Sequence, residues 1–499
     1  MLIQPTTEDL KAVGYNIGRI VIAFGFTMVV PLLTALFLGE WDPLLDFIIG
    51  FLVCLIVGLA FMVSFKTKKD LDWVQGLVVS STSWIFAMIL GAIPLFFSGH
   101  YLSFLDACFD SMSGIATTGL ALIQDLDHLS HAHNMWRHLL MFIGGQGIIV
   151  IGLTFLIRGS AGAYRMYIGE ARDEKIMPNV IHTARFIWGI SFIYLLVGIL
   201  ALSILFANMG IPLLKSFLHS VWIFMAAYDT GGFTPQSQNI LYYHNFGVEL
   251  VTILFMVLGT LNFALHFALW SGNRKEYRKN IEIFTMLSTL TLVCVTAFIS
   301  LNKFTTYPHW LAIFRKGFYQ LISAHSGTGY MTIYAARFND WGALGIFAVI
   351  MAMAFGGSAC STAGGIKALR LGLSLKILVQ NIKSIMAPGG AIIIEKFHHI
   401  KDIVMDDKII RSTLIITLLY IIAYIFGTAA GMYYGYPLQD AAFESVSACA
   451  NVGLSIGVTT PSMPSGLKVV YIILMWMGRL EFMSIFALMG FIFSILEGK

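Results

Sequence analysis

Long apolar runs separated by short polar loops dominate the chain. The hydrocarbon core of a bilayer, roughly 30 Å thick, is crossed by about 20 apolar residues in a helix. By that measure the pattern predicts a multi-pass, all-α membrane protein with ten transmembrane helices. The predicted spans cover residues 17–39, 44–65, 77–98, 138–157, 186–207, 247–270, 283–301, 341–357, 412–435 and 468–494.

Basic residues are concentrated in the loops on one side of these spans. The loops after the second, fourth and sixth spans, together with the segment 367–411, carry 20 Lys and Arg, whereas the opposite loops carry seven. Because Lys and Arg accumulate in cytoplasmic loops, we expect both termini in the cytoplasm and the protein in the cytoplasmic (inner) membrane.

Four of the opposite loops contain a moderately apolar stretch that is too short to span a bilayer. Each stretch ends in a Gly-centred motif and lies between two spans, so the unit helix, re-entrant hairpin, helix occurs four times. This pattern predicts four pore repeats around one pseudo-fourfold axis, preceded by two extra helices. The predicted division is 1–70 for the N-terminal pair, then 71–182, 183–280, 281–400 (with an intramembrane gate loop) and 401–499 for the four repeats.

The four motifs suit a cation filter. Irregular backbone at membrane depth is tolerated only where it is buried in protein or lines a cavity, and rings of backbone carbonyls can replace the hydration shell of an ion. Glycine allows the unusual φ values that aim carbonyls inward, and the carboxyl end of each short helix favours a cation. The predicted filter residues are Ala116, Thr117, Thr118, Gly119 and Leu120; Asp229, Thr230, Gly231, Gly232 and Phe233; Ser326, Gly327, Thr328, Gly329 and Tyr330; and Ala450, Asn451, Val452, Gly453 and Leu454.

Acidic residues near the motifs are expected at the outer mouth, where negative charge raises the local concentration of cations. Two of them, Asp110 and Glu444, lie on the short helices and could instead accept hydrogen bonds from the filter backbone. The whole set is Asp106, Asp110, Asp125, Asp127, Asp229, Asp440 and Glu444.

From about residue 77 to its end, the chain resembles the TrkH/KtrB/HKT superfamily of potassium transporters. FDSMSGIATTGL resembles that family's first pore helix and filter, GGSACSTAGGIKALR (356–370) its break in the third repeat, and WMGRLEF (476–482) its last pore-lining helix. The extra N-terminal helices favour the TrkH-like branch.

Glycine at position four of all four motifs implies, by this resemblance, a K⁺-selective pore. Asp229 and the pairs Gly231-Gly232 and Ser326-Gly327 depart from the usual family pattern. The residues expected to hold K⁺ are Thr117, Thr118, Thr230, Gly231, Gly327, Thr328, Asn451 and Val452.

A run of small residues interrupts the eighth predicted span. Gly and other small residues lower helix stability, so we expect the helix to unwind there, and the resemblance implies a gate beneath the filter. Close packing of helices through small residues is the alternative. The predicted gate comprises Ser358, Ala359, Cys360, Ser361, Thr362, Ala363, Gly364 and Gly365, with Arg479 from the last span.

Arg479 is an ionisable residue within a predicted span, and such residues face the bundle interior or a cavity. The resemblance places it near the gate loop; a static ion pair is the alternative. Glu481 is expected to point elsewhere on the same helix and to pair with a neighbouring span.

Composition agrees with a membrane transporter. Only 12% of residues are charged, against roughly 25% in soluble domains, and the mean hydropathy is +0.80. The absence of a dense Lys/Arg stripe interleaved with aromatics argues against nucleic-acid binding. We expect lipid to cover the outside.

The expected function is therefore uptake of potassium through a gated, K⁺-selective pore, without an organic cofactor in this chain. A Na⁺- or H⁺-coupled K⁺ symporter and a non-selective K⁺/Na⁺ pathway remain alternatives. An enzyme is not expected, because His398, His399 and Asp402 form the only candidate polar group and lack a matching partner. The resemblance implies a homodimer with a nucleotide-binding, TrkA-like regulatory subunit docked on loops 158–185 and 366–411.

Overall fold

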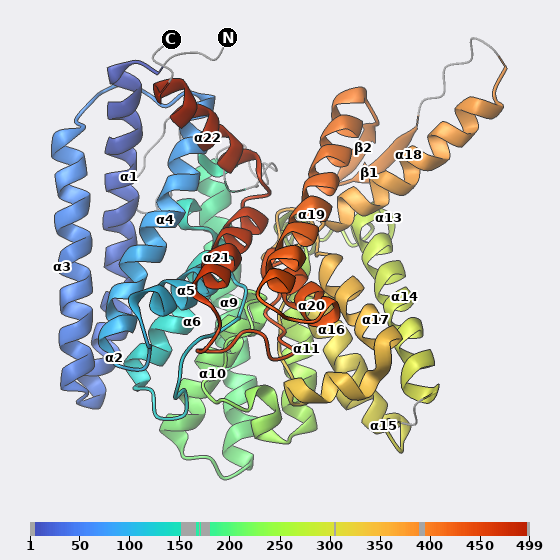
Figure 1. Cartoon of the computed structure of the whole chain (residues 1–499), viewed down its shortest axis with the longest axis horizontal. Helices are drawn as coiled ribbons and strands as arrows, with labels where there is room; N and C mark the ends of the chain where they lie inside the picture. Colours follow the sequence, from blue (N-terminus) through green and yellow to red (C-terminus); the bar gives the residue numbers. More distant parts are fainter. Residues whose placement is uncertain are drawn as a thin grey trace.

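The computed structural model describes residues 5–150, 166–168, 170, 180–303, 306–388 and 395–496. Helices make up nearly all of the regular structure in this part of the chain (Figure 1). The expected all-α class is confirmed. One small element is added to it, an antiparallel hairpin of β1 (Lys396–His399) and β2 (Lys401–Val404). The hairpin forms because Ile400 turns the chain with φ 62° and Phe397 enters a small apolar core with Leu373 and Ile377.

Fewer helices than expected are long and apolar enough to cross a bilayer. Among the described residues six qualify, and two bent pairs raise the number to eight, against the ten predicted. The predicted span 138–157 corresponds to a 16-residue helix, α6 (His131–Gln146), and part of that span lies outside the described residues. The predicted span 341–357 corresponds to α17 (Gly342–Ala354), which has 13 residues.

The N-terminal addition is a hairpin of helices. A capping box between Thr6 and Asp9 starts the first helix, and Gly39, with φ 71°, ends the first arm. Apolar side chains such as Phe37, 82% exposed, cover its outer surface, as expected for a surface in contact with lipid. The arm consists of α1 (Thr7–Thr27) and α2 (Val29–Leu38), and the return helix is α3 (Trp41–Ser64).

The rest of the chain repeats one order of elements four times: a long helix, a short helix, an extended segment and a second helix. The long helices are α4 (Trp73–Phe97), α9 (Val180–Asn208), α14 (Ile281–Lys303) and α19 (Asp407–Tyr433). The short helices are α5 (Phe104–Ile115), α10 (Leu213–Tyr228), α16 (Tyr319–His325) and α20 (Leu438–Cys449). The second helices are α6, α11 (Phe246–Thr260), α17 and α21 (Ser465–Arg479).

Shorter elements complete the repeats. α15 (Trp310–Ala312) and the π-helical turn Ile313–Phe318 lead directly into α16, and 3-10 turns cover Asn239–Tyr243 and Ala335–Trp341. Beyond the second helices lie α12 (Phe263–Trp270), α13 (Glu276–Lys279), α18 (Ala368–Met386) and α22 (Met483–Leu496).

The second helix of each repeat is interrupted, although the sequence predicted a break only in the third. The chain bends by 101° between α11 and α12 and by 111° between α21 and α22. At the first bend Leu261 is extended and the Asn262 side chain caps Ala264 N. At the second, Glu481 and Phe482 have φ 51° and 69°, so the predicted continuous spans 247–270 and 468–494 are wrong at these points.

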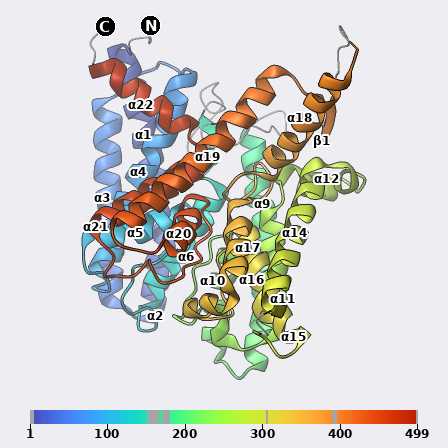
Figure 2. The same ribbon diagram turned by 45° about the vertical axis from the view of Figure 1, so that its right-hand side comes forward.

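The repeats surround a common centre, with the four short helices inside the bundle (Figures 1 and 2). α22 packs against α4 and α21 against α5, so the last repeat adjoins the first. Both chain ends, α18 and the β-hairpin lie at one end of the molecule, and α15 lies at the other (Figure 1). The four Gly-centred motifs are thereby brought together.

Candidate ion-conducting site

The four short helices end in the same way. In each, the residue at the third motif position donates its N–H to a carbonyl five residues earlier, at 2.8 or 2.9 Å. The pairs are Thr118 with Ser113, Gly231 with Ala226, Thr328 with Ser323, and Val452 with Ser447. The helices therefore deliver four backbone segments in one conformation, which are the four predicted filter segments.

Two positions in each segment have positive φ. The fourth position is always glycine, with φ of 94°, 74°, 82° and 85° at Gly119, Gly232, Gly329 and Gly453. The second position is glycine only in the third segment; elsewhere Thr117, Thr230 and Asn451 have φ of 52°, 50° and 55°. Non-glycine residues rarely adopt this region, and such strain is typical of functional segments.

The fourth-position glycines close a ring. A Cβ added to Gly119 would lie 2.3 Å from the carbonyl oxygen of Gly231, in the next repeat. The same relation connects Gly232 to Thr328 at 2.0 Å, Gly329 to Val452 at 2.0 Å, and Gly453 back to Thr118 at 1.9 Å. Each repeat thus contacts the next through one glycine and one third-position carbonyl, and the fourth contacts the first.

Side chains on the short helices hold the segments that follow the motifs. Asp110 accepts a hydrogen bond from Leu122 N at 2.6 Å. Glu444 accepts from Val458 N at 3.1 Å and from Thr459 Oγ1 at 2.9 Å. Both carboxylates are fully buried. They accept backbone hydrogen bonds, as the second predicted role proposed, but from residues after the motifs and not from the predicted filter residues.

Asp229 is not at a mouth, where the sequence placed it. It is the C-cap of α10 and is fully buried. Its carboxylate accepts a hydrogen bond from Gln146 Nε2 at 2.7 Å, so it contacts the end of α6 in the first repeat. The sequence could not reveal this partner because the two residues are far apart along the chain.

The predicted gate run forms a closed loop between α17 and α18. Gly356 N donates to Ile366 O at 2.9 Å and Ile366 N to Ala354 O at 3.1 Å, so the two ends of the loop are joined. Thr362 Oγ1 donates to Gly259 O at 2.8 Å and to Tyr228 O at 3.1 Å, at the ends of α11 and α10.

The loop lies directly against the start of the filter segments. A Cβ on Gly364 would be 2.3 Å from Ala450 O, and one on Gly327 would be 3.4 Å from Ala363 Cβ. In the other three repeats the carbonyl at the end of the short helix instead packs on a glycine of the second helix. A Cβ on Gly144, Gly259 or Gly478 would lie 1.7–1.8 Å from the carbonyl oxygen of Ile115, Tyr228 or Cys449.

Arg479 connects the loop to the first repeat. Its guanidinium donates to Thr362 O in the loop and, at 2.6 Å, to Gly144 O near the end of α6. Arg479 ends α21 rather than lying within a continuous span. The guanidinium therefore spans the centre of the bundle beneath the filter segments and holds the loop in place.

Three charged residues that the sequence did not assign to the site lie around Arg479. Glu481 pairs with Arg370, and its Oε1 lies 4.0 Å from Lys367 Nζ. Its partner therefore lies on α18, which is not one of the predicted spans. Lys367 also donates to Ala363 O in the loop. A cavity of about 20 Å³, lined partly by Glu170, Ser361 and Arg479, leaves room for roughly one water.

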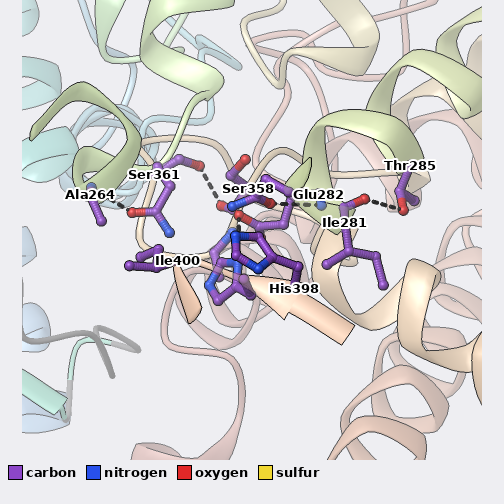
Figure 3. A network of polar contacts seen from close by, with 12 residues as sticks. Ala264, Ile281, Glu282, Thr285, Ser358, Ser361, His398 and Ile400 are labelled. Carbon is purple, nitrogen blue, oxygen red and sulfur yellow. Dashed lines mark hydrogen bonds and ion pairs between the residues drawn. The ribbon is translucent and has the colours of Figure 1, made fainter. Parts of the chain in front are cut away.

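Glu282 is a further residue that sequence reasoning missed. It lies in the first turn of α14, is fully buried, and accepts a hydrogen bond from Ala359 N of the loop at 2.6 Å. Its other oxygen lies 3.7 Å from His399 Nδ1 on the hairpin. Figure 3 shows Glu282 beside Ser358 of the loop, with His398 and Ile400 of the hairpin close by. Acidic residues are common in the first turn of a helix, so the sequence alone could not distinguish Glu282 from an ordinary residue at a helix start.

The sequence of the chain matches one protein family over most of its length. The family model TrkH, described as a cation transport protein, matches residues 44–492. The chain belongs to the TrkH family. This confirms the resemblance seen in the motifs, and the family is one of transporters and not of enzymes.

Relatives of this TrkH-family chain match over nearly the whole length of both proteins. It is 32% identical to an uncharacterized cation transporter of Methanocaldococcus jannaschii, over 97% of this chain and 96% of the relative. It is 29% identical to the Trk system potassium uptake protein TrkG of Escherichia coli, over 95% and 96%, and 28% identical to TrkH of that organism, over 96% and 98%.

The fold of the TrkH-family chain matches that of a solved structure. The crystal structure of the potassium transporter TrkH from Vibrio parahaemolyticus superposes with a TM-score of 0.80 at 24% identity, covering 96% of this chain and 98% of that one. The chain is thus a multi-pass membrane cation transport protein with the TrkH fold.

Proposed function

We propose that this protein takes up K⁺ through a single gated pore on the pseudo-fourfold axis. The observation that carries the proposal is the closed ring in which each fourth-position glycine contacts a third-position carbonyl of the next repeat. Four equivalent backbone segments supply rings of carbonyl oxygens, which can replace the hydration shell of K⁺. The predicted filter residues and the set predicted to hold K⁺ keep these roles in the proposal.

Side-chain oxygens at the second motif position support a cation at the same place. Within the described residues, Thr117 Oγ1 and Asn451 Oδ1 are buried and accept no hydrogen bond. A buried oxygen without a partner costs free energy, and a dehydrated cation would provide that partner. The carboxyl ends of four helices, which converge here, favour the same positive charge.

The gate in this proposal is the loop Ser358–Gly365 with Arg479. The loop lies against the start of the third and fourth segments, and Arg479 fixes it to the first repeat. A positive guanidinium beneath the filter opposes the passage of a cation, so opening requires that Arg479 and the loop move aside.

The division into an N-terminal pair (1–70) and four repeats (71–182, 183–280, 281–400 and 401–499) belongs to the same proposal. So do a cytoplasmic location of both termini in the cytoplasmic membrane, a homodimer, and a nucleotide-binding, TrkA-like regulatory subunit. Of the proposed docking loops, much of 158–185 and residues 389–394 lie outside the described residues.

The test is flux of K⁺ and Na⁺ into liposomes that hold the purified chain, with and without an imposed pH or Na⁺ gradient. We expect saturable K⁺ flux that exceeds Na⁺ flux and ignores both gradients. Flux that follows one gradient would replace the pore with the alternative, a coupled symporter. Equal K⁺ and Na⁺ flux would favour the non-selective pathway and count against the filter.

A further inference from the structure

A basic pocket opens beside the β-hairpin. The hairpin lies at the end of the molecule that carries both termini (Figure 1). Its volume is about 520 Å³. Arg278 and Lys279 of α13, Lys376 of α18 and Lys396 of β1 line it, and among the described lining residues Asp402 is the one acidic side chain. Basic side chains from three separate elements, α13, α18 and β1, therefore line the same pocket.

Hydrogen bonds fix the walls of this pocket. Lys376 Nζ donates to Lys396 O at 2.7 Å, which joins α18 to β1. His398 lies between Asp402, at 2.7 Å, and Glu276, at 3.0 Å, which joins the hairpin to α13. The pKa of Asp402 is lowered by its hydrogen bond to His398 and by the charges of Lys279 and Lys396, among others. Asp402 is thus already paired with His398. The three lysines and Arg278 therefore give the pocket a positive charge.

The floor of the pocket is apolar and continues onto the outer surface of α14. Ile281, Phe284 and Phe397 line it. Phe284 is 75% exposed and Leu287, one turn further along α14, is 61% exposed. α14 is long and apolar enough to cross a bilayer, so this flank faces lipid. A small soluble anion would engage the basic wall alone, whereas an amphiphile would cover both surfaces.

We propose that this pocket binds the phosphate-bearing headgroup of an anionic phospholipid, with an acyl chain along Phe284 and Leu287. Basic pockets next to the ends of transmembrane helices recognise such headgroups, and Lys and Arg pair strongly with phosphate oxygens. The site lies outside the proposed filter and gate, partly within the proposed docking loop 366–411, and does not depend on which cation passes through the pore.

The experiment measures the thermal unfolding of the full chain in neutral detergent with added phosphatidylglycerol, phosphatidylcholine or inorganic phosphate. A ligand that binds the folded protein raises its unfolding temperature. We expect phosphatidylglycerol alone to raise it, and a titration of this shift gives the affinity. In the double variant Lys279→Gln/Lys396→Gln the affinity should fall roughly tenfold or more, because two basic contacts to a headgroup are lost.

The matched control is Lys275→Gln/Lys401→Gln. These lysines flank the same segments and are exposed, but they do not line the pocket. The control should keep the affinity of the unmodified chain. Both double variants change exposed side chains, so each should remain folded. An equal loss in the control, an equal effect of phosphatidylcholine, or an equal effect of inorganic phosphate would each overturn the proposal; the last would indicate a site for a soluble anion.

Discussion

Gly453 approaches Thr118 so closely that a Cβ on Gly453 would lie 1.9 Å from the Thr118 carbonyl oxygen. This contact joins the last repeat to the first and completes the ring of four predicted filter segments. Because the neighbouring atom is backbone, a side chain at Gly453 can be accommodated only if a carbonyl of the ring moves. The ring thus requires glycine at this position for two reasons, the close approach and the φ of 85°.

Replacing a ring glycine should weaken ion selectivity. Gly119→Ser has slightly more room, 2.3 Å against 1.9 Å for Gly453→Ser, so we expect the smaller effect at Gly119. A disturbance of about 1.4 kcal/mol lowers the ratio of K⁺ to Na⁺ permeability about tenfold, and flux into liposomes measures that ratio.

The control is Gly435→Ser, whose φ of 91° is similar but whose Cβ would meet nothing within 4 Å. It should leave the permeability ratio unchanged. If Gly119→Ser and Gly453→Ser also leave the ratio unchanged, these glycines do not belong to the filter.

Removing the guanidinium that holds the loop should open the pore. In Arg479→Ala the bonds to Thr362 O and Gly144 O are lost, together with a positive charge on the ion path. We expect K⁺ flux to rise several-fold, and shortening the loop 358–364 should act in the same direction. Arg411→Ala, which changes an exposed arginine at the start of α19, serves as the control. A fall in flux with normal membrane insertion would contradict a gate.

Glu282 should position the gate loop. Glu282→Ala removes the carboxylate that accepts a hydrogen bond from the partly buried Ala359 N. Loss of a hydrogen bond to a charged group costs about 1.5–3 kcal/mol. We therefore expect higher flux and a lower unfolding temperature. Glu282→Gln keeps an acceptor for Ala359 N but removes the charge that faces His399, so it should change flux less. Equal flux in the unmodified chain and in both variants would show that the contact between Glu282 and Ala359 has no part in gating.

Lys468 and Asp106 form a buried ion pair between the start of α21 and α5, with Lys468 Nζ 2.6 Å from Asp106 Oδ1. Breaking a buried pair leaves an uncompensated charge, which costs about 3–5 kcal/mol. Asp106→Leu should therefore strongly lower the unfolding temperature of the purified chain. Adding Lys468→Met should restore most of the lost unfolding temperature, because the unpaired charge of Lys468 is then removed as well. If the second substitution restores nothing, packing and not charge explains the loss.

His398 should make the hairpin sensitive to pH. Hydrogen bonds to Asp402 and Glu276 raise the pKa of His398 above its usual value of about 6.5. Because the pKa is raised in the folded protein, protonated His398 stabilises the hairpin fully below about pH 6.5. This stabilisation is lost as the pH rises through the folded-state pKa of His398. Hydrogen exchange at Ile400 N, which donates to Glu276 Oε1, should accelerate at alkaline pH beyond its intrinsic rate. His398→Gln should abolish this extra acceleration; its persistence would exclude His398 as the cause.

Local patterns were sufficient to predict the main parts of this protein. The apolar runs indicated membrane helices, and the four glycines at equivalent places indicated four equivalent backbone segments, because positive φ is a local requirement that glycine satisfies. The break in the third repeat was also visible, since a run from Gly356 to Gly365 cannot support a stable helix. The family resemblance depends on these same residues.

Tertiary contacts decided the rest. α6 ends at Gly147, whose φ is 99°. For α11 and α21 no local signal predicted an end at this level, because Thr260 and Arg479 are compatible with continuing a helix. All three helices end where pore-helix carbonyls pack on Gly144 and its counterparts in the other repeats. Two spans predicted as continuous are therefore bent. In the described part of the chain six helices, or eight with the bent pairs, are long and apolar enough to cross a bilayer.

The sequence by itself determined the membrane class, the fourfold repetition and the conformation of the motif glycines, since each depends on residues close together in the chain. Only the tertiary structure decided which repeat contacts which, that Asp229 pairs with Gln146, and that Glu282 and Arg479 hold the loop. These contacts join residues far apart in sequence, and their energies depend on distances of a few ångströms that only the folded chain defines.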